Sequence, residues 1–163
     1  MKSKWTLAVV VGLVGLAATA GVVLATPGAG FTAAQQWKGV FDAIDVKNET
    51  DSHELELKTK GVSDVYVTRN AIAVGGHSGW HTHPGPSLII VTVGEIMAYE
   101  GDDPTCTPKR YRAGEGFVDP GDGHVHLLRN ESGAPAETVA VQILPQGADR
   151  RIDVAPAPGN CPF

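Results

Sequence analysis

From residue 47 onward, the chain is a succession of short apolar runs separated by residues that favour turns. The runs are too short for amphipathic helices, and no helical period of useful length is present in this region. The breaks between them are rich in Gly, Pro and Asp, which supply positive φ angles or preset turns. This pattern predicts an all-β domain, an antiparallel sandwich or barrel. The runs lie at 55–57, 65–74, 88–93, 96–99, 117–118, 124–128 and 138–144.

Two His-x-His pairs fall within this region, His81-Thr82-His83 and His124-Val125-His126. They contain four of the six histidines of the sequence. In a β-strand, residues i and i+2 point to the same face, so two imidazoles can converge on one ion. Neutral imidazole is a ligand that Zn, Fe, Cu and Ni all accept. The pairs therefore predict a site for a divalent transition metal and leave the identity of that metal open.

The first pair is part of a longer pattern that resembles the first motif of the cupin superfamily. That motif reads Gly, five residues, His-x-His, three or four residues, Glu, six residues, Gly. Here five residues lie between Gly75 and His81-x-His83, and Gly94 closes the pattern. Ser87 occupies the position of the glutamate.

The second pair overlaps a stretch that resembles the second cupin motif, which reads Gly, five residues, Pro-x-Gly, two residues, His, three residues, Asn. Gly114 and Pro120 match its beginning, and Gly123, His126 and Asn130 match its end. One extra residue lies between Pro120 and Gly123. Because both motifs occur in order, the stretch 75–130 resembles a small single-domain cupin.

The resemblance implies a cupin-type antiparallel β-barrel (jelly roll) with His81, His83 and His126 as metal ligands. A serine hydroxyl is a far weaker ligand than a carboxylate, so with Ser87 in the fourth position we expect a three-histidine site with open coordination positions. Three neutral ligands leave the +2 charge of the ion uncompensated, which favours a small anionic ligand or substrate. The resemblance also implies a homodimer.

His124 has no counterpart in the cupin motifs. If residues 124–128 form one strand, His124 faces the same side as His126. It is then a fourth ligand, a hydrogen-bonded group that handles protons beside the metal, or a surface histidine. In an enzyme, His124 and Ser87 are the two candidates for a catalytic role.

The N-terminus resembles an export segment. Lys2 and Lys4 precede an uncharged run over 5–25 that ends in small residues. The run is longer than the core of an ordinary signal peptide and close to the length that spans a bilayer, so it predicts a helix that is either a cleaved signal peptide or an uncleaved membrane anchor. Both alternatives deliver the rest of the chain outside the cytoplasm, secreted or tethered at the cell surface.

The cysteines and the charge balance agree with that destination. Cys106 and Cys161 are the only two cysteines, and a pair can persist as a disulfide in an oxidising compartment. The formal net charge is −5, and no basic cluster is present in the body of the chain, so nucleic acid is not an expected partner.

The sequence divides into four predicted parts. Residues 1–25 are the signal peptide or anchor, and residues 26–46 are a linker or packing arm, because they show no sustained periodicity. Residues 47–155 form the barrel, and residues 156–163 form a C-terminal tail tethered through Cys161.

Two main hypotheses for function follow from the three-histidine site. The first is a metal-dependent oxidoreductase, similar to the cupin dioxygenases, that acts on a small molecule bound beside the metal. The second is a non-catalytic module outside the cytoplasm that binds a small ligand or a metal, since the motifs contain no convincing acid/base pair. A third hypothesis is a closed structural zinc site with His124 as the fourth ligand.

Overall fold

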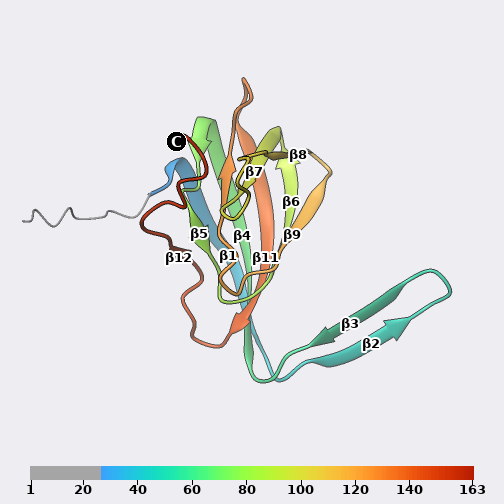
Figure 1. Ribbon diagram of the computed structural model, residues 1–163. Helices are drawn as coiled ribbons and strands as arrows, with labels where there is room; N and C mark the ends of the chain where they lie inside the picture. Colours follow the sequence, from blue (N-terminus) through green and yellow to red (C-terminus); the bar gives the residue numbers. More distant parts are fainter. Residues whose placement is uncertain (1–26) are drawn as a thin grey trace, which may run out of the picture.

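A computed structural model describes residues 27–163, which are organised into strands without any helix in that range (Figure 1). The strands are β1 (Ala29–Phe41), β2 (Asp45–Glu49), β3 (Glu54–Lys58), β4 (Ser63–His77), β5 (His81–Thr82), β6 (Ser87–Val93), β7 (Glu95–Glu100), β8 (Lys109–Arg112), β9 (Gly116–Asp119), β10 (His126–Arg129), β11 (Ala136–Pro145) and β12 (Ile152–Asp153).

Ten of these strands form a nearly closed antiparallel barrel with two curved layers. One layer has the order β1-β4-β11-β6-β9, and the other has the order β12-β5-β10-β7-β8. The layers are joined where Arg129 of β10 pairs with His77 of β4. The predicted all-β antiparallel barrel is therefore confirmed. Its interior is where same-face side chains from both layers meet.

The apolar core fills one end of the barrel. Buried side chains from β4, β6, β7, β10 and β11 pack together there, and none of them is more than 5% exposed. Burial of such aliphatic side chains is the main favourable contribution to folding, about 1.5–3 kcal/mol for each. The members of this core are Ile72, Val91, Ile96, Ala98, Leu128 and Ala136.

A second, smaller cluster fastens the C-terminal tail to the barrel. Trp80, Tyr99 and Leu127 are buried in it, and the tail covers them. Cys106 and Cys161 form a disulfide with a Cα–Cα distance of 5.2 Å. The predicted disulfide is confirmed, and it closes a loop of 55 residues over this cluster.

Residues 26–46, which the sequence predicts as a linker or packing arm, include the long strand β1. It pairs with β4 along its whole length, from Ala29 opposite His77 to Phe41 opposite Ser63, with two register shifts. Most of its residues are exposed on both faces. A strand held mainly by backbone hydrogen bonds needs no apolar alternation, which explains why periodicity did not reveal it.

The strands β2 and β3 form a hairpin that projects away from the barrel (Figure 1). Their residues pair only with each other, and nearly all are exposed, including Leu55 at 50%. The barrel is thus built from β1 and from β4 onward, whereas the sequence predicts residues 47–155 for it. Alternation of leucines with charged residues at 54–58 is typical of a half-buried strand, and it does not distinguish one from an exposed hairpin.

The predicted N-terminal helix, as a signal peptide or anchor over 1–25, lies outside the described residues. In residues 27–163, no helix has the length and apolar character required to cross a membrane.

Candidate metal site

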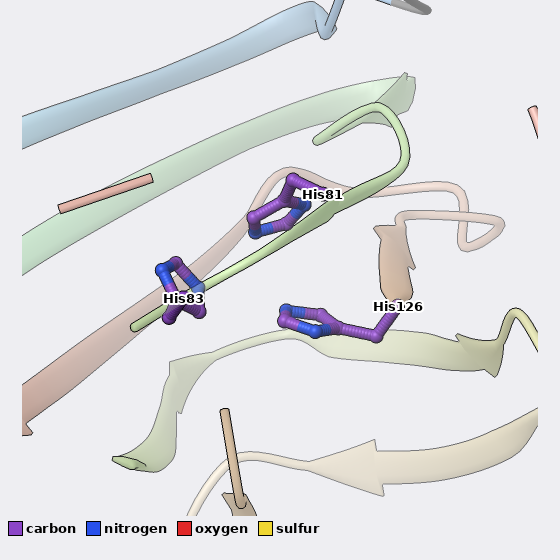
Figure 2. Close-up of side chains that lie close together, drawn as sticks. All are labelled: His81, His83 and His126. Atoms are coloured by element: carbon purple, nitrogen blue, oxygen red, sulfur yellow. The ribbon is translucent and has the colours of Figure 1, made fainter. Parts of the chain in front are cut away.

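Three of the four paired histidines meet inside the barrel (Figure 2). His81 and His83 come from β5 and the residue that follows it, and His126 opens β10 directly opposite His81. Their ring centroids are 4.3–5.4 Å apart, and each residue is no more than 8% exposed. One nitrogen from each ring lies within 4.8 Å of the other two, a spacing suited to three ligands around one ion.

Backbone carbonyls fix the orientation of two of these rings. The Nδ1 atom of His81 donates to the carbonyl of Gly79 at 2.8 Å, and the Nδ1 atom of His83 donates to the carbonyl of Arg150 at 2.6 Å. A carbonyl can only accept, so both rings carry the proton on Nδ1 and leave Nε2 free. This is the arrangement in which histidine ligands are normally held beside a metal.

The environment keeps all three imidazoles neutral at pH 7. Burial lowers the pKa of His81 well below its usual value, and the neighbouring His126 and Arg151 lower it further. Burial also lowers the pKa of His83, although the Arg150 carbonyl opposes this shift. Burial lowers the pKa of His126 to about 4, with Asp119 acting in the opposite direction. Because only neutral imidazole ligates, the donor set fits a borderline divalent metal without the loss of a proton.

A cavity of about 500 Å³, counted with its opening to solvent, adjoins the three histidines. Its walls are apolar on one side, and Arg150 and Arg151 belong to its lining. The guanidinium of Arg150 donates to Gln142, and that of Arg151 donates to the carbonyl of Ser78. The apolar part of the wall consists of Phe31, Ala33, Ile89, Leu128 and Ala140.

Ser87 also lines the cavity and is 1% exposed. Its hydroxyl accepts a hydrogen bond from the amide of Gln142 at 3.2 Å. The position that carries glutamate in the cupin motif therefore lines the cavity next to the histidines, with a small neutral side chain.

Asp119 is the site residue that the sequence analysis missed. It ends β9 directly opposite Ser87 and is 2% exposed. Its Oδ1 atom accepts from the backbone N–H of Gly121 at 3.2 Å and lies 3.0 Å from Nδ1 of His124. Its Oδ2 atom is buried without a hydrogen-bond partner, 3.8 Å from Nε2 of His83. Position 119 lies between Gly114 and Pro120 of the second motif, but only the β6–β9 register brings it beside Ser87.

His124 belongs to a different group from the one formed by the other three histidines. It lies just before β10, its side chain is 27% exposed, and its ring is stacked 6.1 Å from that of His126. Its Nδ1 atom faces Asp119 and its Nε2 atom lies 2.9 Å from Oε2 of Glu100. Both ring nitrogens are thus directed at carboxylates, and the second cluster of ligand atoms consists of Asp119, His124 and His126.

Asn130, at the end of the second motif, is fully buried and holds a turn. Its amide donates to the carbonyls of Ile72 and Ala134, and its carbonyl oxygen accepts from the backbone of Ser132. Its role is therefore in the fold.

Comparison with known proteins shows a likeness in structure and none in sequence. No family model matches the chain, and no curated protein matches it. The polyketide cyclase RemF from Streptomyces resistomycificus has a TM-score of 0.52 at 15% identity, over 84% of each chain. A cupin superfamily protein from Desulfitobacterium hafniense gives 0.44 at 11% identity, over 69% of this chain and 82% of that one. A double-stranded β-helix domain protein from Klebsiella pneumoniae gives 0.45 at 22% identity, over 66% and 76%.

Proposed function

We propose that this cupin-fold chain binds one divalent transition metal (Fe, Zn, Cu or Ni) through His81, His83 and His126, and that it acts on a small molecule in the adjoining cavity as a dioxygenase-like oxidoreductase. The observation that carries the proposal is the geometry of the three imidazoles. They are buried and neutral, and two of them are held with Nε2 free. When bound, such a metal would polarise a substrate oxygen or activate O₂. RemF, which shares the fold, is a polyketide cyclase, and this supports a small-molecule enzyme.

The chain's own residues would select an anionic substrate. Arg150 and Arg151 line the cavity, and each makes a hydrogen bond that fixes its position. Arg151 is also paired with Asp153, so the positive charge available to a ligand would come mainly from Arg150. The apolar residues of the lining would pack against the apolar part of the same molecule and exclude water. A small molecule with one acidic group and an apolar body fits this lining.

A non-catalytic binding module is the second candidate. It is favoured by the scarcity of acid/base groups in the cavity, where the histidines are the proposed ligands and Thr68 and Ser87 supply the hydroxyls of the lining. In that case His81, His83 and His126 would hold the metal and the arginines would hold the ligand, with no turnover.

The site would operate outside the cytoplasm. The Cys106–Cys161 disulfide suits an oxidising compartment, and the apolar run over 5–25 would direct export or tether the chain to the membrane. N-terminal sequencing of the mature protein from membrane and soluble fractions would distinguish a retained anchor from a cleaved signal peptide.

We further propose that two copies pair through the outer face of the β1-β4-β11-β6-β9 layer. An apolar row, here called the outer row, crosses all five strands on this face, and three of its members are 48–69% exposed. It consists of Trp37, Val67, Val141, Leu88 and Val118, each paired with the next across the strands.

A second copy fits this face better than a charged partner. Near the row, the charged side chains are Arg69 and Glu137, which neutralise each other at 2.6 Å. Because each chain has a net charge of −5, two copies would repel each other through their charged surfaces, and an uncharged face is the one through which they could associate. Five strands, each contributing about seven residues, give a flat area of roughly 24 by 23 Å. Protruding side chains increase the surface that such a face can bury toward the ~800 Å² per partner of a standard interface.

The metal-binding proposal is tested by elemental analysis of purified protein beside His81→Ala and His126→Ala. We expect stoichiometric metal in the unaltered protein and its loss in both variants. His53→Ala is the matched control, because His53 is exposed beside the β2–β3 hairpin. Oxygen uptake by the iron-loaded protein with acidic thiols, phenols and diketones then separates an enzyme from a binding module. Stoichiometric metal in both site variants would refute the three-histidine site.

A further inference from the structure

A buried carboxylate stands opposite the position from which the cupin motif would supply one. Ser87 and Asp119 are direct partners across β6 and β9, and both side chains are buried on the inner face. The carboxylate missing from β6 is thus present on the adjacent strand, at the same level of the barrel. The pairing of Ser87 with Asp119 is not part of either cupin motif.

We propose that Asp119 is the fourth metal ligand, a carboxylate moved from β6 to β9. The inference rests on the proposed three-histidine metal site and deepens it. It makes the site three imidazoles and one carboxylate in place of the under-coordinated three-histidine site that Ser87 predicts.

The two oxygens of Asp119 have different surroundings, and the difference supports a ligand role. Oδ1 is occupied by the Gly121 N–H and by His124. Oδ2 is buried with no hydrogen-bond partner and lies 3.8 Å from His83 Nε2, the nitrogen left free for a metal. Two ligands that each lie about 2.1 Å from one ion are separated by at most ~4.2 Å, so Asp119 Oδ2 and His83 Nε2 are close enough to share an ion. The ligand atoms of the three histidines lie within 4.8 Å of one another, whereas Asp119 is that close to His126 but not to the whole set, so Asp119 would move toward the ion on binding. A buried carboxylate oxygen without a hydrogen-bond partner destabilises the fold unless a cation binds to it.

Glu100 and His124 form a chain of contacts that ends at the Oδ1 atom of Asp119. His124 contacts Oδ1 of Asp119 through Nδ1 at 3.0 Å and faces Glu100 through Nε2 at 2.9 Å. This chain of contacts fixes the carboxylate with Oδ2 turned toward the histidines. His124 is therefore a positioning residue that holds a ligand, which accounts for its place outside the three-histidine group.

The charge of the site changes accordingly. Three neutral imidazoles and a divalent ion carry +2, and a ligating carboxylate lowers this to +1. A hard oxygen ligand also improves the fit for Fe²⁺ relative to Cu, because carboxylates suit harder ions. The attraction for an anionic substrate would then come from Arg150 as much as from the ion.

The test is titration of the metal-free protein with Co²⁺, monitored by its visible absorption, for the unaltered chain and Asp119→Asn. We expect Asp119→Asn to weaken cobalt binding at least tenfold and to change the spectrum. Asp122→Asn is the matched control, because Asp122 is exposed on the same turn and should bind cobalt like the unaltered chain. Circular dichroism confirms that each variant is folded. Unchanged affinity and spectrum in Asp119→Asn would overturn the inference.

A second variant separates a ligand from a group that only orients His83 or His126. Both native cysteines are in the disulfide, so the unaltered chain has no thiolate. In Asp119→Cys saturated with Co²⁺, a ligand position gives thiolate-to-cobalt charge-transfer absorption, and an orienting position gives none. Absence of that band would therefore reject Asp119 as a ligand. Failure of the unaltered chain to bind Co²⁺ at all would instead refute the proposed metal site itself.

Discussion

Two rows of side chains, one residue apart in sequence, lie on opposite faces of the β1-β4-β11-β6-β9 layer with their polarity reversed. The outer row, defined above, is apolar and largely exposed. The inner row faces the barrel, is polar, and has three members that are no more than 3% exposed. It consists of Lys38, Tyr66, Gln142, Ser87 and Asp119, again paired across the strands.

An antiparallel sheet that covers a core normally places apolar side chains inward and polar ones outward. Further along the same layer the usual order holds, since Ile72, Val91 and Ala136 are in the core. Buried polar side chains also occur on neighbouring rungs, at Thr68, Asn70 and Thr138, but the reversal crosses all five strands at the inner row. Buried polar groups do not favour folding unless they are satisfied, and exposed apolar rows favour association. The difference is what the two proposals require, a metal site on the inner face and pairing with a second copy on the outer face.

The largest effect is expected from charges placed in the outer row. In Trp37→Glu/Leu88→Glu, like charges would face each other across the two copies at a cost of several kcal/mol. We expect the dissociation constant of the dimer to rise at least ~100-fold, measured by analytical ultracentrifugation. Val46→Glu is the control, because Val46 is 52% exposed on the β2–β3 hairpin, away from this face. Unchanged association in the double variant would assign the outer row no role in pairing.

The inner face should make the metal-free protein sensitive to acid. His126 has a folded-state pKa of about 4, against about 6.5 in the unfolded chain. The unfolded chain therefore binds more protons between these values, so stability is complete above pH 6.5 and is lost as the pH falls toward 4. The shift corresponds to roughly 3 kcal/mol for this one group. Burial lowers the pKa of His81 and His83 too, so their contributions to stability are also lost as the pH falls.

Urea unfolding in the presence of a chelator at pH 7, 5.5 and 4 measures this loss. The His126→Gln variant should show a shallower dependence on pH. The outer-row double variant should keep the slope of the unaltered chain, because its introduced carboxylates stay exposed. A flat profile in the unaltered chain would show that the buried histidines are not held neutral.

The polar interior of the barrel could be predicted from the sequence only in part. The spacing of His81, His83 and His126 within two motifs predicted that these side chains converge, because a strand period of two fixes which residues share a face. Asp119 was missed because its importance depends on the register between β6 and β9, which no local pattern encodes. The outer row was invisible for another reason. In a run such as 88–93, apolar residues occupy both faces, so hydrophobicity does not tell which face is covered.

β1 illustrates the same limit for the fold. Its pairing with β4 supplies the backbone partners, and the register shift between Gln35 and Trp37 decides that Trp37, and not Lys38, faces outward. Such a bulge moves every later side chain to the other face. Turn residues and apolar runs therefore predicted a barrel, but could not place this strand in it.

A smaller effect is expected from removal of one polar group of the inner row. Gln142 accepts a hydrogen bond from Arg150 at 3.1 Å and donates to Ser87 at 3.2 Å. Gln142→Leu would leave both partners unpaired at a cost of about 1–3 kcal/mol. Urea unfolding of the metal-free protein measures the loss. A variant as stable as the unaltered chain would show that the interior tolerates an apolar residue here.

The smallest effect is expected when a hydroxyl replaces a methyl group on the outer face. Val141 is next to Gln142 in sequence and is half-buried on the outer face. Threonine has nearly the same shape and suits a strand, so Val141→Thr should change the free energy of unfolding of a single copy by less than about 0.5 kcal/mol. The measurement is made in the Trp37→Glu/Leu88→Glu background, where pairing is absent. A loss as large as that of Gln142→Leu would mean that the outer face is packed within one chain and needs no second copy to cover it.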